Sequence, residues 1–284
     1  MLKDITLGQY FPGNSILHRL DPRIKILATV LLIVIVFLAK NLLGYGVLLL
    51  LTAVLVAVSG IPVKTILKSI KPLILIVLLT VLMNVFFTGG ENVLVDAKFW
   101  IIHLKITVEG LLAGLKMALR ILLLITCTGV VLTYTTSPID LTDGIERLLS
   151  PLGKIGLPVH TFAMMMSLAL RFVPTLIEET DKIIAAQKSR GADFSSGNIV
   201  RRVKALIPIL IPLLISSFRR ADELALAMEC RCYHGGGGRT RMKQLKIKAG
   251  DLLFLVFIAL FVGICFLPSL PSALFGIENM NFTV

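Results

Sequence analysis

The sequence predicts an all-α, polytopic membrane protein with about five transmembrane helices and a cytoplasmic platform of long amphipathic helices. Of its 284 residues, 56% are hydrophobic and only 16% are charged, and the mean hydropathy is +0.90. Soluble globular proteins carry about 25% charged residues, so this chain has too few charges to cover a soluble domain. The same figures exclude disorder. A disulfide-stapled secreted module is excluded too, because the chain has only four cysteines.

Five apolar runs approach the roughly 20 residues that cross a bilayer. They are residues 24–40, 42–58, 72–87, 111–134 and 252–267. The first two are joined by so short a turn that an antiparallel hairpin is expected, and Pro72 stands where the start of a helix tolerates proline. Two other apolar stretches are not expected to span. Leu157–Val173 contains His160 and Arg171, and Ala205–Ile215 is short and holds two prolines.

The distribution of Lys and Arg predicts the orientation. The chain carries a net charge of +12, and 24 of its 29 basic residues lie in residues 1–25, in the loop 60–71 and in residues 135–250, which fall on one side of the expected spans. Because cytoplasmic loops are enriched in basic residues, the N-terminus is expected to face the cytoplasm and the C-terminus the outside. The polar residues 1–23 do not form a cleavable signal, so the first span is expected to stay as an anchor.

These boundaries divide the chain into three regions. Residues 1–134 form a membrane region of four spans, 135–250 a cytoplasmic region, and 251–284 a last transmembrane helix with an external tail. Between the third and fourth spans, Gly89–Gly110 is expected to form an interfacial hairpin anchored by Trp100. Lys116 and Arg120, four residues apart in the fourth span, could line an ion path. Snorkelling to the outer headgroups is favoured, because the span offers no acidic partner.

The cytoplasmic region has 17 basic and 10 acidic residues together with apolar strips. Helices are expected over Asp140–Ser150, Val173–Arg190 and Ile215–Tyr233. The second is acidic at its start and basic at its end, as the helix dipole favours, and Gly191 directly after it is a natural left-handed C-cap.

Two of these helices end in an arginine between small residues, and a shift of 41 positions places Arg190 on Arg231. A guanidinium at the tip of a long helix suits insertion into a groove of a partner, where its fork finds carboxylates and carbonyls. The alternative is that each arginine only compensates the helix dipole, which contributes a few tenths of a kcal/mol. The two interpretations carry similar weight.

Catalytic chemistry is not expected. The run Gly235–Gly238 lacks the Lys-Ser/Thr ending of a phosphate loop, so a flexible joint is favoured. Cys230, Cys232 and His234 are closely spaced, but their ligands would point in different directions at a helix end, which disfavours a metal site. Cys127 and Cys265 lie in spans and are expected to pack there. No cofactor, metal or catalytic residue is therefore assigned.

The run Ser15–Lys25 (SILHRLDPRIK) leads into the first span, and two arginine triplets stand at helix ends about 40 residues apart. These triplets are Ser189-Arg190-Gly191 and Cys230-Arg231-Cys232. With these features the chain resembles, over essentially its whole length, the transmembrane T component of energy-coupling factor (ECF) transporters, the EcfT/CbiQ family. The triplets look like that family's two X-Arg-X coupling motifs. One departure is that cysteines flank Arg231, where family members often have Ala and Gly.

The resemblance implies a non-catalytic transporter subunit in a prokaryotic cell membrane. It would join two ABC-type ATPases to a membrane-embedded S component that captures a vitamin or a metal ion. The residues expected to couple to the ATPases are Ser189, Arg190, Gly191, Cys230, Arg231 and Cys232. Met164, Met165, Met166 and Leu168 would face the S component, since flexible methionine suits a surface that accepts several partners. Gap filling in a helical core explains these methionines equally well.

Two other functions remain open at the sequence level. The permease of a conventional ABC importer would also lack an ATPase, but it would couple through one short helix and carry its own substrate path. A membrane anchor that binds lipid or nucleic acid would gather its basic residues in polar stretches. Here they alternate with apolar strips, so nucleic acid is not an expected partner, whereas the lipid bilayer is.

Overall fold

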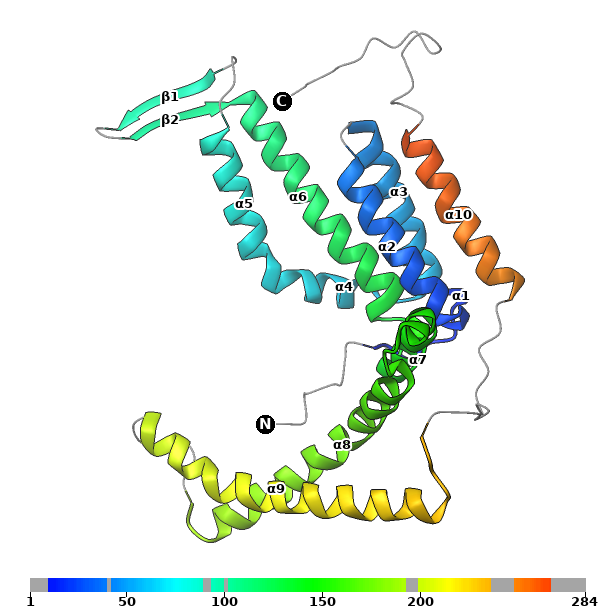
Figure 1. Ribbon diagram of the computed structural model, residues 1–284. Coiled ribbons are helices and arrows are strands. Elements are labelled where there is room, and N and C mark those ends of the chain that lie inside the picture. The colour runs from blue at the N-terminus through cyan, green and yellow to red at the C-terminus, as the bar shows by residue number, and fades with distance from the viewer. Residues whose placement is uncertain are drawn as a thin grey trace. The chain divides into compact units, whose positions relative to one another are not determined.

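The computed structural model describes residues 10–39, 42–88, 93–99, 102–192, 199–235 and 248–266 (Figure 1). Its fold is that of an all-α membrane protein, as the composition predicts, with one short β-hairpin added. The chain divides into two compact units. Residues 9–137 and 245–284 are named the bundle unit here, and residues 138–244 the arm unit; each is described on its own.

The bundle unit contains most of the apolar helices. In chain order its elements are α1 (Ile16–Arg19), α2 (Pro22–Leu38), α3 (Leu42–Ser59), α4 (Val63–Ile70), the 3₁₀ turn η1 (Lys71–Leu73), α5 (Ile74–Phe87), β1 (Val93–Phe99), β2 (Ile102–Thr107), α6 (Val108–Thr128), the π-helical turn η2 (Gly129–Thr133) and α10 (Ala249–Phe266). The start of α2 is well defined, because Pro22 fixes the first turn and the Asp21 carboxylate accepts a hydrogen bond from the Arg23 backbone N–H at 3.0 Å.

Helices α2, α3, α6 and α10 pack around a common apolar core (Figure 1). Its buried members include Leu32, Val36, Leu48, Leu51, Leu123 and Ile258. The opposite faces are apolar as well, since Val34, Phe37, Leu49, Leu50, Val256 and Leu260 are exposed. A bundle that is apolar both inside and outside fits a hydrocarbon surrounding rather than water.

Two glycines allow α6 to lie close against α5. A Cβ added at Gly110 would come within 3.1 Å of the Val85 carbonyl oxygen, and one at Gly114 within 3.3 Å of the Val81 carbonyl oxygen. Small residues four apart are the usual means by which helices approach in membranes. The hydroxyl of Thr107 reinforces the pair, because it caps α6 at Gly110 and donates to the Thr88 carbonyl at 3.0 Å.

Arg120 is held inside the bundle unit by groups that the sequence did not suggest. Its Nε donates to the hydroxyl of Tyr45 at 3.1 Å, and its Nη2 donates to the carbonyl of Ala39 at 3.3 Å. The guanidinium also lies 6.0 Å from the ring centroid of Phe37. This half-buried arginine therefore links α6 to the α2–α3 hairpin through neutral partners, whereas the sequence analysis had looked for an acidic one.

A cluster of buried polar groups lies where α2, η2 and α10 meet. The Lys25 side chain is 1% exposed, and its Nζ donates to the Thr135 carbonyl at 2.8 Å and to the Thr136 hydroxyl oxygen at 3.2 Å. Asp251 accepts a hydrogen bond from the Asp21 backbone N–H at 2.9 Å, which ties the start of α10 to the start of α2. These contacts fix the last residues of the bundle unit, just before α7 begins at Pro138.

Two segments between the expected spans have regular structure. The hairpin expected in Gly89–Gly110 is confirmed as the antiparallel pair β1–β2, in which Phe99 pairs with Ile102; Trp100 lies outside the described residues. The second segment differs from expectation. Residues 60–71 were taken as a loop, but the helix α4 forms there, followed by a 3₁₀ turn that contains Pro72.

By length and composition, three helices among the described residues can cross a membrane. They are Val63–Phe87, Val108–Thr133 and Val159–Ser189. Gly44–Ser59 and Ala249–Ile264 are shorter apolar helices. The sequence analysis did not expect Leu157–Val173 to span, and the longer helix Val159–Ser189 that contains most of it meets this criterion of length and composition. The five-span topology stays a prediction.

The arm unit consists of α7 (Pro138–Leu149), the 3₁₀ turn η3 (Ser150–Ile155), α8 (Val159–Ser189) and α9 (Ile199–Cys230). Helices α8 and α9 begin 14 and 16 residues before the expected starts at Val173 and Ile215. Both continue through internal prolines, Pro174 in α8 and Pro208 and Pro212 in α9, although the two prolines of Ala205–Ile215 had counted against a span there.

Candidate functional site

The end of α8 presents Arg190 through a defined backbone motif. Arg190 is the C-cap residue, and Gly191 follows with a φ of +83°. The Gly191 N–H donates to the Lys188 carbonyl at 3.0 Å, and the Ala192 N–H donates to the Gln187 carbonyl, also at 3.0 Å. This pair of bonds is a Schellman motif, so the left-handed C-cap expected at Gly191 is confirmed.

The end of α9 repeats this motif around Arg231. The Cys232 N–H donates to the Glu229 carbonyl at 2.8 Å, and the Tyr233 N–H donates to the Met228 carbonyl at 3.0 Å. Arg231 thus occupies the same C-cap position as Arg190. The residue after it, Cys232, has a φ of +55° and is the one non-glycine residue with positive φ in the described part of the chain. A side chain in that conformation is strained, and glycine at the equivalent position of α8 is not.

All six residues of the two triplets are exposed. Ser189 donates back to the Ala185 carbonyl at 3.1 Å, so its hydroxyl is engaged within α8. Cys230 and Cys232 are free thiols. His234 Nδ1 hydrogen-bonds with the Cys232 carbonyl oxygen at 2.9 Å, and no group of three potential metal ligands gathers in the described residues.

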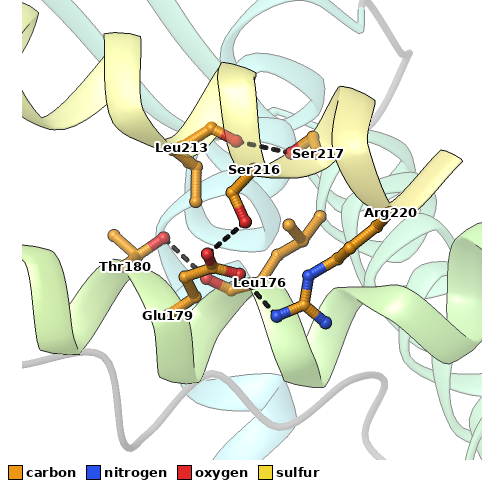
Figure 2. A network of polar contacts seen from close by, with 7 residues as sticks. All are labelled: Leu176, Glu179, Thr180, Leu213, Ser216, Ser217 and Arg220. Atoms are coloured by element: carbon orange, nitrogen blue, oxygen red, sulfur yellow. Dashed lines mark hydrogen bonds and ion pairs between the residues drawn. The ribbon is translucent and has the colours of Figure 1, made fainter. Parts of the chain in front are cut away.

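The two helices cross at a polar contact (Figure 2). The Glu179 carboxylate on α8 accepts hydrogen bonds from the Ser216 hydroxyl and, at 2.8 Å, from Nη2 of Arg220, both on α9. Nearer the end of α8, the Gln187 side-chain amide donates to the Pro208 carbonyl at 3.4 Å. Residue numbers therefore rise along α8 while they fall along α9, so the helices are antiparallel where they touch. No local sequence pattern predicts the contacts of Glu179, because its partners lie 37 and 41 positions away in the chain.

The crossing places the two arginines symmetrically. Arg190 lies eleven positions beyond Glu179, and Arg231 lies eleven positions beyond Arg220. At 1.5 Å per residue each tip is about 16 Å along its helix from the crossing contact. Because the helices are antiparallel there, the tips lie on opposite sides of the crossing, as the ribbon shows (Figure 1).

Helix α7 is fastened to the other end of α8. His160 Nδ1 and the buried Glu146 carboxylate are 2.8 Å apart, which joins α7 to the first turn of α8. No partner for His160 is evident from the sequence, and the structure supplies Glu146. A spacing of 14 residues across a turn gave no local signal for the pair.

The four residues expected to face an S component lie early in α8. Met165 and Met166 are exposed, and Met164 and Leu168 are half-buried. Phe162 is also exposed and lies three and four residues before the two exposed methionines, so the three form one apolar strip. The methionines therefore divide between surface and packing.

Comparison with known proteins agrees with the sequence motifs. A family model described as cobalt transport protein (CbiQ) matches residues 13–245. The energy-coupling factor transporter transmembrane protein EcfT of Acidaminococcus fermentans is 57% identical over 268 residues, which cover 94% of this chain and 98% of that protein. EcfT of Ruminiclostridium cellulolyticum is 55% identical over 89% of this chain and 92% of that protein, and EcfT of Lactococcus lactis 46% identical over 90% and 95%. The chain therefore belongs to the CbiQ/EcfT family of energy-coupling factor transporter transmembrane proteins.

Proposed function

We propose that this protein is the coupling subunit of an ECF-type importer for vitamins or other micronutrients. In this function it transmits ATP-driven conformational change from two ABC-type ATPases to a membrane-embedded S component. The observation that carries the proposal is the pair of matched Schellman caps, which expose Arg190 and Arg231 on opposite sides of one helix crossing. Two equivalent tips suit two equivalent ATPases.

Dipole compensation explains this arrangement less well. It needs a positive charge anywhere in the last turn, and α8 already has Lys188 there. It does not require the arginine to occupy the same cap position in both helices, nor a strained Cys232 to preserve that position in α9. A docked guanidinium needs a fixed direction of approach, because its planar fork must meet carboxylate or carbonyl oxygens at defined angles.

The crossing supports transmission of force. If the ATPases move the two arginine tips relative to each other, the angle at which α8 and α9 cross should change, because the two tips lie at equal distances from the contact between Glu179 and Arg220. Such a change would shift the first half of α8, where Phe162, Met165 and Met166 form the apolar strip. The S component would rest on this strip, since exposed flexible side chains can adapt to different partners.

The remaining parts of the proposal concern chemistry and orientation. ATP hydrolysis would belong to the partner ATPases, and this subunit would need no cofactor. The arm unit would lie in the cytoplasm of a prokaryotic cell, together with the N-terminus, as the distribution of basic residues indicates. The transported substrate would be selected by the S component.

Purification of the protein from its native membrane tests this function. The expected result is recovery of two ABC-type ATPase subunits together with small hydrophobic membrane proteins. Recovery of an ATPase dimer without a small membrane protein would instead identify a conventional importer permease. Recovery of neither would contradict a transport function.

A further inference from the structure

Helix α4 combines lysines with apolar residues in a regular pattern. Lys64 and Lys68 lie on it, and Lys71 follows directly after it, so the three share one face at spacings of four and three residues. All three are exposed. Residues 60–73 include no Asp or Glu, so no acidic neighbour in this segment neutralises the lysines.

The remaining positions of α4 fall into two adjoining sectors. Ile66, 5% exposed, and the half-buried Ile70 face the bundle unit. Val63 and Leu67 lie next to them around the helix and are 59% and 60% exposed. With about 100° per residue, the order around the helix is protein core, exposed apolar side chains, then lysines.

A bend at Pro72 separates α4 from α5. The 3₁₀ turn η1 contains this proline, and α4 points away from the axis of α5 in the ribbon (Figure 1). On α5, the exposed apolar residues Ile74, Leu75, Leu78 and Leu79 continue from those of α4. The segment Val63–Phe87 is one of the three that can cross a membrane, so α4 lies at the end of a span.

We infer that α4 is an interfacial helix whose lysines bind the headgroups of anionic phospholipids on the cytoplasmic face of the membrane. Around the helix, exposed apolar side chains are followed by lysines, just as acyl chains are followed by headgroups in a lipid monolayer. Val63 and Leu67 contact acyl chains that also cover α5, and the lysine stems extend outward to place their ammonium groups among phosphates. The helix thereby fixes the depth of α5 in the membrane.

An acidic surface of a partner protein would also attract the lysines. The apolar sector argues for lipid, because whatever covers the lysines must at the same time cover Val63 and Leu67, which are continuous with the lipid-facing side of α5. A bilayer with anionic headgroups supplies acyl chains next to Val63 and Leu67 and negative charges next to the lysines.

The test measures lipid preference of the full-length protein. The protein is reconstituted in phosphatidylcholine membranes, and the association constants of spin-labelled phosphatidylglycerol and spin-labelled phosphatidylcholine are compared at low salt. The wild type is expected to prefer phosphatidylglycerol. Because one lysine near an anionic surface is worth about fivefold in binding, the triple variant K64Q/K68Q/K71Q should reduce the preference by at least about fivefold. High salt should reduce the wild-type preference in the same way.

A matched variant controls for total charge. K182Q/K188Q/K204Q removes three exposed lysines from the arm unit and should keep the wild-type preference. The single variant K68Q, which changes only one exposed side chain, should give an intermediate value and guards against a folding defect of the triple variant. The inference is overturned if the α4 triple keeps the wild-type preference, or if the control loses as much. It is also overturned if the α4 triple instead loses ATPase copurification with lipid preference unchanged, since the partner would then be protein.

Discussion

The Arg220 guanidinium on α9 lies 2.8 Å from the Glu179 carboxylate on α8, and 41 positions separate these residues, as they separate Arg190 from Arg231. Counted in residues along the two helices, the ion pair therefore lies midway between Arg190 and Arg231. Both side chains are half-buried, so the pair is screened less than a fully exposed one.

Charge reversal tests the pair. Glu179→Lys places like charges together at the crossing and should lower the thermal unfolding midpoint. The exchanged double variant E179K/R220E should recover most of that loss, because the attraction is restored in the opposite sense. A double-mutant cycle by thermal unfolding measures the coupling. Additive losses would show that the two side chains do not interact.

Cys232 should be replaceable by glycine with a gain in stability. The φ of +55° is strained for a residue with a Cβ, so Cys232→Gly should stabilise the end of α9 by about 0.5–1 kcal/mol. Cys232→Val should destabilise it by 1 kcal/mol or more, because a β-branched residue tolerates positive φ least. Gly191→Val should do the same at the end of α8. Equal unfolding midpoints for the Gly and Val variants of Cys232 would argue against the Schellman motif there.

Lys25 should be essential for the stability of the bundle unit. Lys25→Met keeps the apolar stem but removes the donor to the Thr135 carbonyl and the Thr136 hydroxyl, and it leaves these buried acceptors without that hydrogen bond. Removing one member of a buried polar cluster should cost about 2–4 kcal/mol. The unfolding midpoint in detergent is the measurement. Lys64→Met, which removes an exposed lysine from the same unit, should change it little.

A charge on the apolar strip of α8 should weaken docking of the S component. Met165 is 53% exposed, so Met165→Glu is tolerated by the fold but forces a partner surface to desolvate a carboxylate. Copurification of the S component should fall at least tenfold while ATPase binding persists. Ser150→Glu adds the same charge at an exposed position in η3 and should leave both unchanged. If Met165→Glu loses the ATPases instead, the strip belongs to the core of the arm unit.

Hydrophobic periodicity and composition predicted those helices and caps that depend only on neighbouring residues. The apolar runs located α2, α3, α5, α6 and α10, and Gly191 predicted the cap of α8, because hydrophobicity and backbone conformation are properties of neighbouring residues. Long-range polar pairs left no such trace. Glu179 with Arg220, and Glu146 with His160, could be paired only once the helices were placed.

Other differences arose where tertiary structure overrode a local rule. Pro208 and Pro212 counted against a span in Ala205–Ile215, but α9 continues through both of them as a helix. Residues 60–71 were treated as a loop between two spans, but Val63–Ile70 form α4. The alternation of lysines and apolar residues in this segment follows a period of about 3.6 residues, which is typical of an amphipathic helix.

The central claim is that Arg190 and Arg231 dock into two ATPases, and substrate uptake in arginine variants tests it most directly. Truncating one partner of a buried, hydrogen-bonded charge pair typically costs about 2–5 kcal/mol. Arg190→Ala and Arg231→Ala should therefore each weaken ATPase copurification and uptake, and Lys should rescue only partly, since a point charge cannot reproduce the planar fork. The double Ala variant should lose both properties, because the two contacts reinforce each other as a bivalent clamp. Wild-type uptake by the double Ala variant, at wild-type protein levels in the membrane, would contradict the account.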